Sequence, residues 1–154
     1  MDDIKFIRSS AFASASIGQV HLATLKCEKH LILKVQYPRI LESITNDIAN
    51  LQSLIGYLNV VPRGVFLDEI VEQGLREVEG ECDYLREMRG MARYRDLLEA
   101  DHELKRLKFQ VPKVVPSLTT KRILVTEYAY GVTIDKCGDL PQEVRNTIGK
   151  GVLR

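Results

Sequence analysis

The stretch that decides the fold class is AFASASIGQVHLATLKCEKHLILKVQYP, residues 11–38. Two runs rich in β-formers, residues 17–25 and 31–37, flank the polar segment KCEKH, and this pattern predicts an antiparallel hairpin. A loop of small residues precedes the first run, and Lys34 lies in the second. Loops of small residues let backbone N–H groups approach phosphate oxygens. Alanine and serine stand here where such loops usually carry glycine, so a nucleotide-binding hairpin and an ordinary turn before a strand both fit.

Two helices are expected after the hairpin. Apolar residues recur at helical spacing over residues 39–58, and the segment VVPRG (60–64) predicts the end of that helix. A longer helix is predicted from about residue 67 to about residue 100. Three glycines within it leave a break or a tight packing contact open, because each costs about 1 kcal/mol relative to alanine: Gly74, Gly80 and Gly90.

The last third of the chain returns to β-structure before a final helix. FQVPKVVP predicts short extended pieces around two prolines, and KRILVTEY (121–128) predicts a buried strand. A last helix is expected to start at Pro141, which suits a first helical position. The resulting order, β-β-α-α-β-β-α, predicts an α+β fold with an antiparallel sheet.

Composition excludes several classes of function. The 154 residues suit one domain, and 22 basic against 21 acidic side chains leave a net charge of +1, which gives no case for nucleic acid as a partner. The three cysteines are far apart and form no C-x-x-C pair, so neither a disulfide framework nor a metal site is predicted. No apolar run approaches the length of a transmembrane helix, and the first residues carry no targeting signal.

Four motifs occur in a distinctive order: ASASIGQVHLA, LKVQYP, ECDYLRE and VTEYAYG. In this order they resemble the UbiB/ADCK family of atypical kinase-like ATPases (aarF-domain proteins), over about residues 10–154. The resemblance implies the small lobe and hinge of a protein-kinase-like fold over residues 1–131, and the beginning of the large lobe over 132–154. A catalytic loop and a D-F-G-like motif do not occur in these 154 residues, so we expect a fragment of a two-lobe enzyme that is inactive alone.

The resemblance assigns nucleotide-binding roles to the alanine-rich loop and to the strand lysine. The loop residues would approach the phosphates with their backbones: Ala13, Ser14, Ala15, Ser16, Ile17 and Gly18. Lys34 would bind phosphate oxygens, because a cation on a buried strand needs a partner. The alternative for Lys34 is a strand lysine whose ammonium reaches water.

The resemblance also assigns carboxylates and hinge atoms. Glu87 would pair with Lys34 as the helix glutamate, although the sequence alone leaves Glu81 open for that role. Glu81 and Asp83 would form the family's E-x-D pair. In the hinge, the Glu127 carbonyl would accept from the adenine amino group, and the Ala129 N–H would donate to a ring nitrogen.

ATP with Mg is the implied cofactor, with the metal ligands outside these 154 residues. The implied role is support of ubiquinone (coenzyme Q) biosynthesis, with proteins of that pathway or a lipid as partners. The implied location is mitochondrial in a eukaryote and otherwise cytoplasmic or membrane-associated. Whether the chain is an enzyme stays open, because a non-catalytic interaction module, a degenerate pseudokinase lobe and a truncated gene product fit the same sequence.

Overall fold

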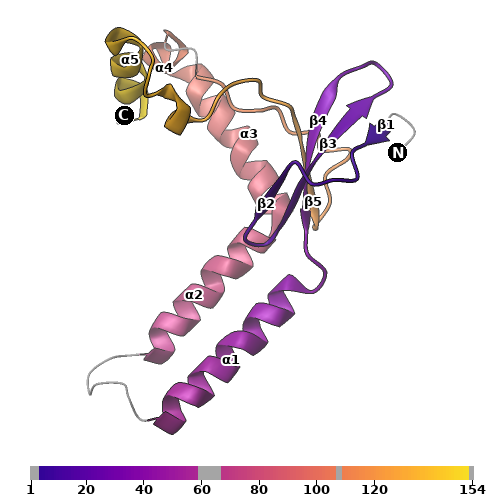
Figure 1. Ribbon diagram of the computed structural model, residues 1–154, viewed down its shortest axis with the longest axis vertical. Helices are drawn as coiled ribbons and strands as arrows, with labels where there is room; N and C mark the ends of the chain where they lie inside the picture. Colours follow the sequence, from indigo (N-terminus) through magenta and orange to yellow (C-terminus); the bar gives the residue numbers. More distant parts are fainter. Residues whose placement is uncertain (1–3, 59–66, 107–108, 153–154) are drawn as a thin grey trace.

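The computed structural model describes residues 4–58, 67–106 and 109–152. Within these ranges a five-stranded antiparallel sheet has the order β1-β3-β4-β5, with β2 added on β3 (Figure 1). The strands are β1 (Ile4–Ile7), β2 (Ala13–Ala15), β3 (Gly18–Leu25), β4 (His30–Gln36) and β5 (Ile123–Glu127). The helices accompany this sheet, and the predicted α+β class is confirmed.

The predicted hairpin is the centre of the sheet. β3 and β4 pair from Gly18 with Gln36 to Thr24 with His30. Glu28, in the connecting turn, has a positive φ of 63°, and β5 then pairs with the other edge of β4 from Leu31 with Glu127 to Val35 with Ile123. The strand predicted over 121–128 is therefore present in a shorter form. Of the extended pieces around the prolines, Val114 forms an isolated bridge with Thr126.

Two strands were missed by the sequence analysis. β1 pairs with the C-terminal half of β3, and β2 pairs with its N-terminal half. The alanine-rich segment predicted as a loop is therefore a short strand over Ala13–Ala15, and the chain reverses at Ser16 and Ile17. Backbone pairing with β3 overrides the low strand propensity of alanine.

The helical region is divided differently from the prediction. α1 (Ile40–Leu58) agrees with the expected first helix, whereas the expected helix over 67–100 is two helices, α2 (Leu67–Cys82) and α3 (Tyr84–Ala100). The break lies at Asp83, whose φ of −90° and ψ of 83° leave the helical region. The predicted stop at 60–64 lies outside the described residues.

The elements extend from the sheet in two directions. α1 and α2 lie side by side as a helical hairpin that projects away from the sheet, while α3 packs beside β5 (Figure 1). α4 (His102–Arg106), the 3-10 turn η1 (Ile134–Cys137) and α5 (Gln142–Val152) gather around the end of α3 that lies away from the sheet. No helix in the described part of the chain is both long and apolar enough to cross a membrane.

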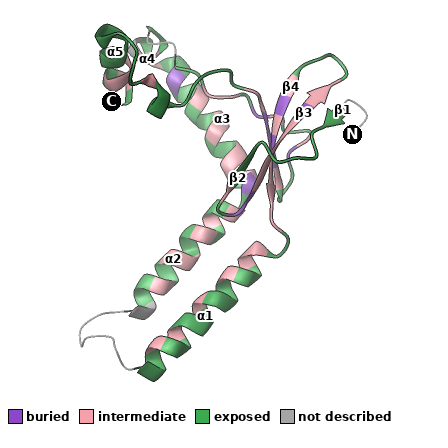
Figure 2. Cartoon of the chain, viewed as in Figure 1, coloured by how far each residue is buried: buried purple, intermediate pink, exposed green. Residues whose placement is uncertain are grey.

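The core consists of two clusters that involve opposite faces of the sheet. Adjacent strand residues point to opposite faces, and Leu33 and Lys34 are such neighbours. One cluster contains Ala23, Leu31, Leu33 and Val125; the other contains Ile17, Tyr84, Val114 and Leu124 and joins the sheet to α3. Figure 2 shows burial concentrated around the sheet, whereas the α1–α2 hairpin is intermediate or exposed along its length.

Candidate functional site

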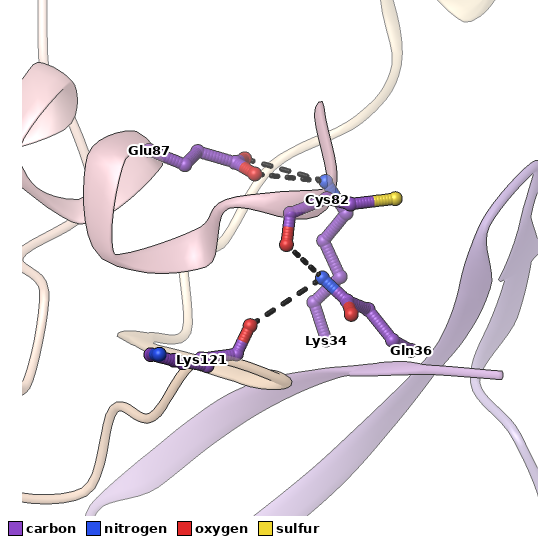
Figure 3. Close-up of polar contacts among 5 residues, drawn as sticks. All are labelled: Lys34, Gln36, Cys82, Glu87 and Lys121. Atoms are coloured by element: carbon purple, nitrogen blue, oxygen red, sulfur yellow. Dashed lines mark hydrogen bonds and ion pairs between the residues drawn. The ribbon is translucent and has the colours of Figure 1, made fainter. Parts of the chain in front are cut away.

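Lys34 lies in the middle of β4, paired with Val20 on one side and Leu124 on the other. Cross-strand partners share a face, so the Lys34 side chain emerges on the face of Leu124, where α3 packs. Its Nζ lies 3.2 Å from Oε2 and 3.3 Å from Oε1 of Glu87 (Figure 3). The two partners are 29% and 35% exposed, and an ion pair this exposed adds little to stability. The contact places the ammonium beside the first turn of α3.

Glu87 is brought to Lys34 by the break at Asp83. The Asp83 carboxylate accepts from the Arg86 N–H at 3.0 Å and caps α3. Glu87 lies in the first turn of this new helix. The ion pair is therefore made by Glu87, and Glu81, which ends up in the last turn of α2, is exposed and has no ion pair among the described residues.

Gln36 holds the α2–α3 junction against β4. Its Nε2 donates to the carbonyl of Cys82 at 2.6 Å and to the carbonyl of Lys121 at 3.5 Å (Figure 3). Because Gln36 and Lys34 are two residues apart on one strand, both side chains leave the same face. Burial, with a smaller contribution from the Glu81 charge, raises the pKa of the Cys82 thiol. The junction is thus tied to the sheet beside the ion pair.

Tyr84 lies beneath the same ammonium. Its ring centroid is 5.0 Å from Lys34 Nζ, and its side chain is fully buried. Burial first, and then the charge of Glu87, raise the pKa of the Tyr84 phenol to about 12. Its hydroxyl has no hydrogen-bond partner within the described ranges.

An open cavity of about 810 Å³ adjoins the ion pair. The turn after β2, the end of α2 and one face of α3 line it: Ala15, Ser16, Ile17, Lys34, Gly80, Glu81, Arg86, Glu87, Gly90, Met91, Tyr94 and Val111. Lys34 and Arg86 supply positive charge, Glu81 and Glu87 supply negative charge, and Ile17, Met91 and Val111 supply apolar wall. The lining thus combines charged groups that can orient a ligand with an apolar surface that can contact its aliphatic or aromatic part.

The structure brings together only part of the predicted phosphate loop. Ala15, Ser16 and Ile17 line the cavity, whereas Ala13 and Ser14 are not among its lining residues and pair with Val20 and Gln19 of β3. Gly18 is buried against β4: a Cβ built on it would lie 2.2 Å from the carbonyl oxygen of Val35. Close packing of two strands is thus sufficient reason for glycine at this position.

The predicted hinge residues line a second, smaller cavity. Glu127 and Ala129 contribute to a space of about 290 Å³, and Val111 lines both cavities. The Glu127 carboxylate accepts a hydrogen bond from the Lys29 ammonium at 2.6 Å. The backbone N–H of Glu127 donates to the Lys113 carbonyl at 2.8 Å. In the described part of the chain, no group of three histidine, cysteine or acidic side chains is placed to hold a metal ion.

Sequence reasoning missed several residues of the site, and a local signal existed for some of them. Met91 and Tyr94 follow Glu87 by four and seven positions, which is the spacing of one helical face, so placing Glu87 at the cavity implies them. Tyr84 and Arg86 lie inside the motif ECDYLRE. Gln36 carried no signal, because its partners are carbonyl groups of segments distant in sequence.

Comparison with known proteins identifies the family of the chain. A family model described as the ABC1 atypical kinase-like domain matches residues 4–154. The chain is 44% identical over 137 residues to the mitochondrial atypical kinase coq-8 of Caenorhabditis elegans. The aligned region covers 89% of this chain and 18% of that protein. The chain is 40% identical over 153 residues to the mitochondrial atypical kinase COQ8B of Danio rerio, covering 99% of this chain and 24% of that protein.

A solved structure shares the fold. Rv3197 of Mycobacterium tuberculosis, solved in complex with erythromycin, superposes with a TM-score of 0.70 at 29% identity, over 96% of this chain and 36% of that one. The chain therefore spans about a fifth to about a third of the proteins it matches. The match over residues 4–154 confirms the resemblance indicated by the four motifs, and the chain belongs to the ABC1 atypical kinase-like family.

Proposed function

We propose that this chain carries the small lobe and hinge of an ATP-binding, kinase-like protein that supports ubiquinone biosynthesis. The observation that carries the proposal is the Lys34–Glu87 ion pair, which lies at the edge of the 810 Å³ cavity and faces the turn at Ala15–Ile17. In phosphoryl-transfer enzymes, a strand lysine paired with a helix glutamate binds nucleotide phosphates.

In this proposal, Lys34 and the backbone of the turn bind the phosphates of ATP, and Glu87 keeps the ammonium in place. The hinge atoms of Glu127 and Ala129 bind the base, because their cavity shares Val111 with the first. Mg²⁺ bound with ATP would neutralise phosphate charge, and we assign its protein ligands to residues outside this chain. Residues 4–131 then form the small lobe, and residues 132–152 begin the large lobe.

The biological role rests on the relatives. Relatives at 44%, 40% and 37% identity, from Caenorhabditis elegans, Danio rerio and Saccharomyces cerevisiae, carry atypical kinase COQ8 names with the designation mitochondrial. We assign this chain a mitochondrial location in a eukaryotic host, with proteins or lipids of ubiquinone biosynthesis as partners. The supporting test is whether the gene restores ubiquinone levels in yeast that lacks its COQ8, compared with the Lys34→Ala form of the same gene.

Nucleotide binding is tested by thermal unfolding with and without Mg-ATP. A ligand at about 100 times its Kd stabilises the folded state by about 2.7 kcal/mol. We expect Mg-ATP to raise the unfolding temperature of the wild type and to have a much smaller effect on Lys34→Ala. Lys5→Ala is the matched control. It also removes an ion pair, which Lys5 of β1 forms with Glu28 in the β3–β4 turn, and neither residue lines the cavity.

Two results would contradict the proposal in different ways. Equal stabilisation of the wild type and Lys34→Ala would show that Lys34 does not contribute to nucleotide binding. Absence of any stabilisation of the wild type would show that the chain does not bind Mg-ATP.

One observation favours an interaction module as the second candidate function. The end of α1 that lies away from the sheet presents large apolar residues to solvent: Leu51, Leu54, Tyr57 and Leu58 (Figure 2). Exposed apolar clusters commonly mark protein contacts. In that case, charge substitution at Tyr57, which is 88% exposed, abolishes function in the yeast assay, and Lys34→Ala does not.

A further inference from the structure

Tyr84 is the first residue of α3, directly after the cap, and it is 0% exposed. Glu87 follows three positions later on the same helix, a spacing at which side chains are neighbours. The Lys34 ammonium lies between the two, 5.0 Å from the ring centroid of Tyr84 and 3.2 Å from the carboxylate of Glu87. One turn of one helix therefore supplies both an aromatic face and a negative charge to the same cation.

The hydroxyl of Tyr84 does not explain why this residue is a tyrosine. It has no partner within the described ranges, and an unpaired buried hydroxyl is unfavourable. The phenol gives Lys34 no negative charge, because a tyrosine with its ordinary pKa of about 10 is already neutral at physiological pH. Burial and the Glu87 charge raise the pKa of Tyr84 further, to about 12. What the side chain does offer the ammonium is the face of its ring.

We propose that Tyr84 is a positioning residue whose ring, together with the Glu87 carboxylate, holds the Lys34 ammonium at the edge of the cavity. A lysine side chain is flexible, and a partly exposed ion pair restrains it weakly. A cation over an aromatic face is attracted by the ring quadrupole, and more strongly where water is excluded. The ring therefore disfavours orientations in which the ammonium turns away into solvent. The effect on nucleotide binding rests on the proposed function, whereas the contact itself does not.

Packing alone is the competing explanation, because Tyr84 also belongs to the core cluster with Ile17, Val114 and Leu124. Two substitutions separate the explanations. Tyr84→Phe keeps the aromatic face and removes only the unpaired hydroxyl, while Tyr84→Leu keeps an apolar side chain and removes the face. Val114→Ala is the matched control, since it weakens the same cluster and leaves the ring in place.

The contact is tested by NMR on the chain labelled with ¹³C in its lysine side chains. Protons above an aromatic ring resonate upfield, so the Hε resonance of Lys34, assigned by its loss in Lys34→Arg, is expected upfield of the other lysines. Tyr84→Phe and Val114→Ala should retain the shift, and Tyr84→Leu should abolish it. An unshifted Lys34 in the wild type, or a shift that persists in Tyr84→Leu, would overturn the proposal. If Tyr84→Leu does not fold, Tyr94→Leu takes its place, because Tyr94 is the other aromatic residue of the cavity lining: the upfield shift should survive Tyr94→Leu, and its loss there would overturn the proposal.

Mg-ATP titration supplies the functional readout. Tyr84→Leu should weaken Mg-ATP binding roughly 3- to 30-fold, the range expected for a lost cation–π contact, while Tyr84→Phe binds like the wild type. Equal binding by Tyr84→Leu and Tyr84→Phe, with both folded, would overturn the positioning role. If the wild type binds no Mg-ATP, the proposed function fails. The NMR experiment still tests the contact between Tyr84 and Lys34, because it requires no nucleotide.

Discussion

Gly18 is the residue on which the centre of the sheet most visibly depends. The family resemblance gives it a place in the nucleotide loop, and the structure adds a packing reason, because its missing Cβ leaves room for the backbone of β4. The nearest atoms to an added Cβ belong to the backbone of Val35 and Gln36. Backbone in the middle of a paired sheet cannot yield as a flexible side chain does.

We predict that Gly18→Ala destabilises the fold by about 1–3 kcal/mol or more, the usual cost of overpacking a tight site. Gly74→Ala is the control, because nothing lies within 4 Å of its Cβ position in α2. In a helix interior that change is expected to stabilise by about 0.5–1 kcal/mol. Urea unfolding of both variants checks the signs. A neutral Gly18→Ala would show that the strands approach less closely than described.

At the scale of elements, the sequence predicts those helices and strands that have a local pattern of apolar or β-forming residues. The β3–β4 hairpin and β5 follow from runs of β-formers, and α1 follows from apolar residues at helical spacing; all were found close to their expected bounds. β1 is four residues long and mostly exposed, so it carries no pattern of its own and exists only through pairing with β3. The glycines left a break within residues 67–100 open, but they did not locate it at Asp83, which lies three positions after Gly80.

The same break determines the geometry of the site, and this yields a prediction at the level of α3. Asp83→Ala removes the cap and should cost about 1 kcal/mol of stability. Fraying of the first turn would displace Glu87 and Tyr84, so Mg-ATP binding should weaken as well. Asp83→Asn, a comparably good cap without the charge, should retain both properties. Chemical denaturation and Mg-ATP titration provide the measurements, and equal behaviour of the two variants would count against the capping role.

The contact between Lys34 and α3 could not be predicted from a local sequence pattern. The residues of the ion pair are 53 positions apart, and their meeting requires the register of β4 as well as the start of α3. The sequence therefore left both Glu81 and Glu87 available, and the structure places Glu87 at the lysine. A family resemblance supplied the expectation, but only the arrangement of elements shows why one carboxylate reaches and the other does not.

At the scale of the whole molecule, packing is uneven. The sheet and the adjoining turn of α3 contain most of the buried residues, while α1 contains none. Residues 40–82 also carry eight acidic and two basic side chains, so the segment that forms the α1–α2 hairpin is acidic and the remainder of the chain is basic. The hairpin is thus set apart from the sheet by both packing and charge.

Uneven packing predicts uneven local stability. Amide hydrogens open most readily where few apolar contacts hold the backbone. Hydrogen exchange followed by mass spectrometry should therefore show faster exchange in α1 and α2 than in β3, β4 and β5. Uniform protection across the hairpin and the sheet would contradict this account of the core.

The central claim is that the cavity beside Lys34 binds the phosphates of ATP, and a reactive ATP derivative tests it at a single atom. An acyl-phosphate derivative of ATP transfers its acyl group to a lysine that lies against the bound phosphates, and peptide mass spectrometry identifies the modified residue. We predict modification of Lys34, suppressed by excess Mg-ATP, with exposed lysines such as Lys26 modified weakly and without suppression. Modification of exposed lysines alone, or a yield at Lys34 that Mg-ATP does not change, would contradict the claim.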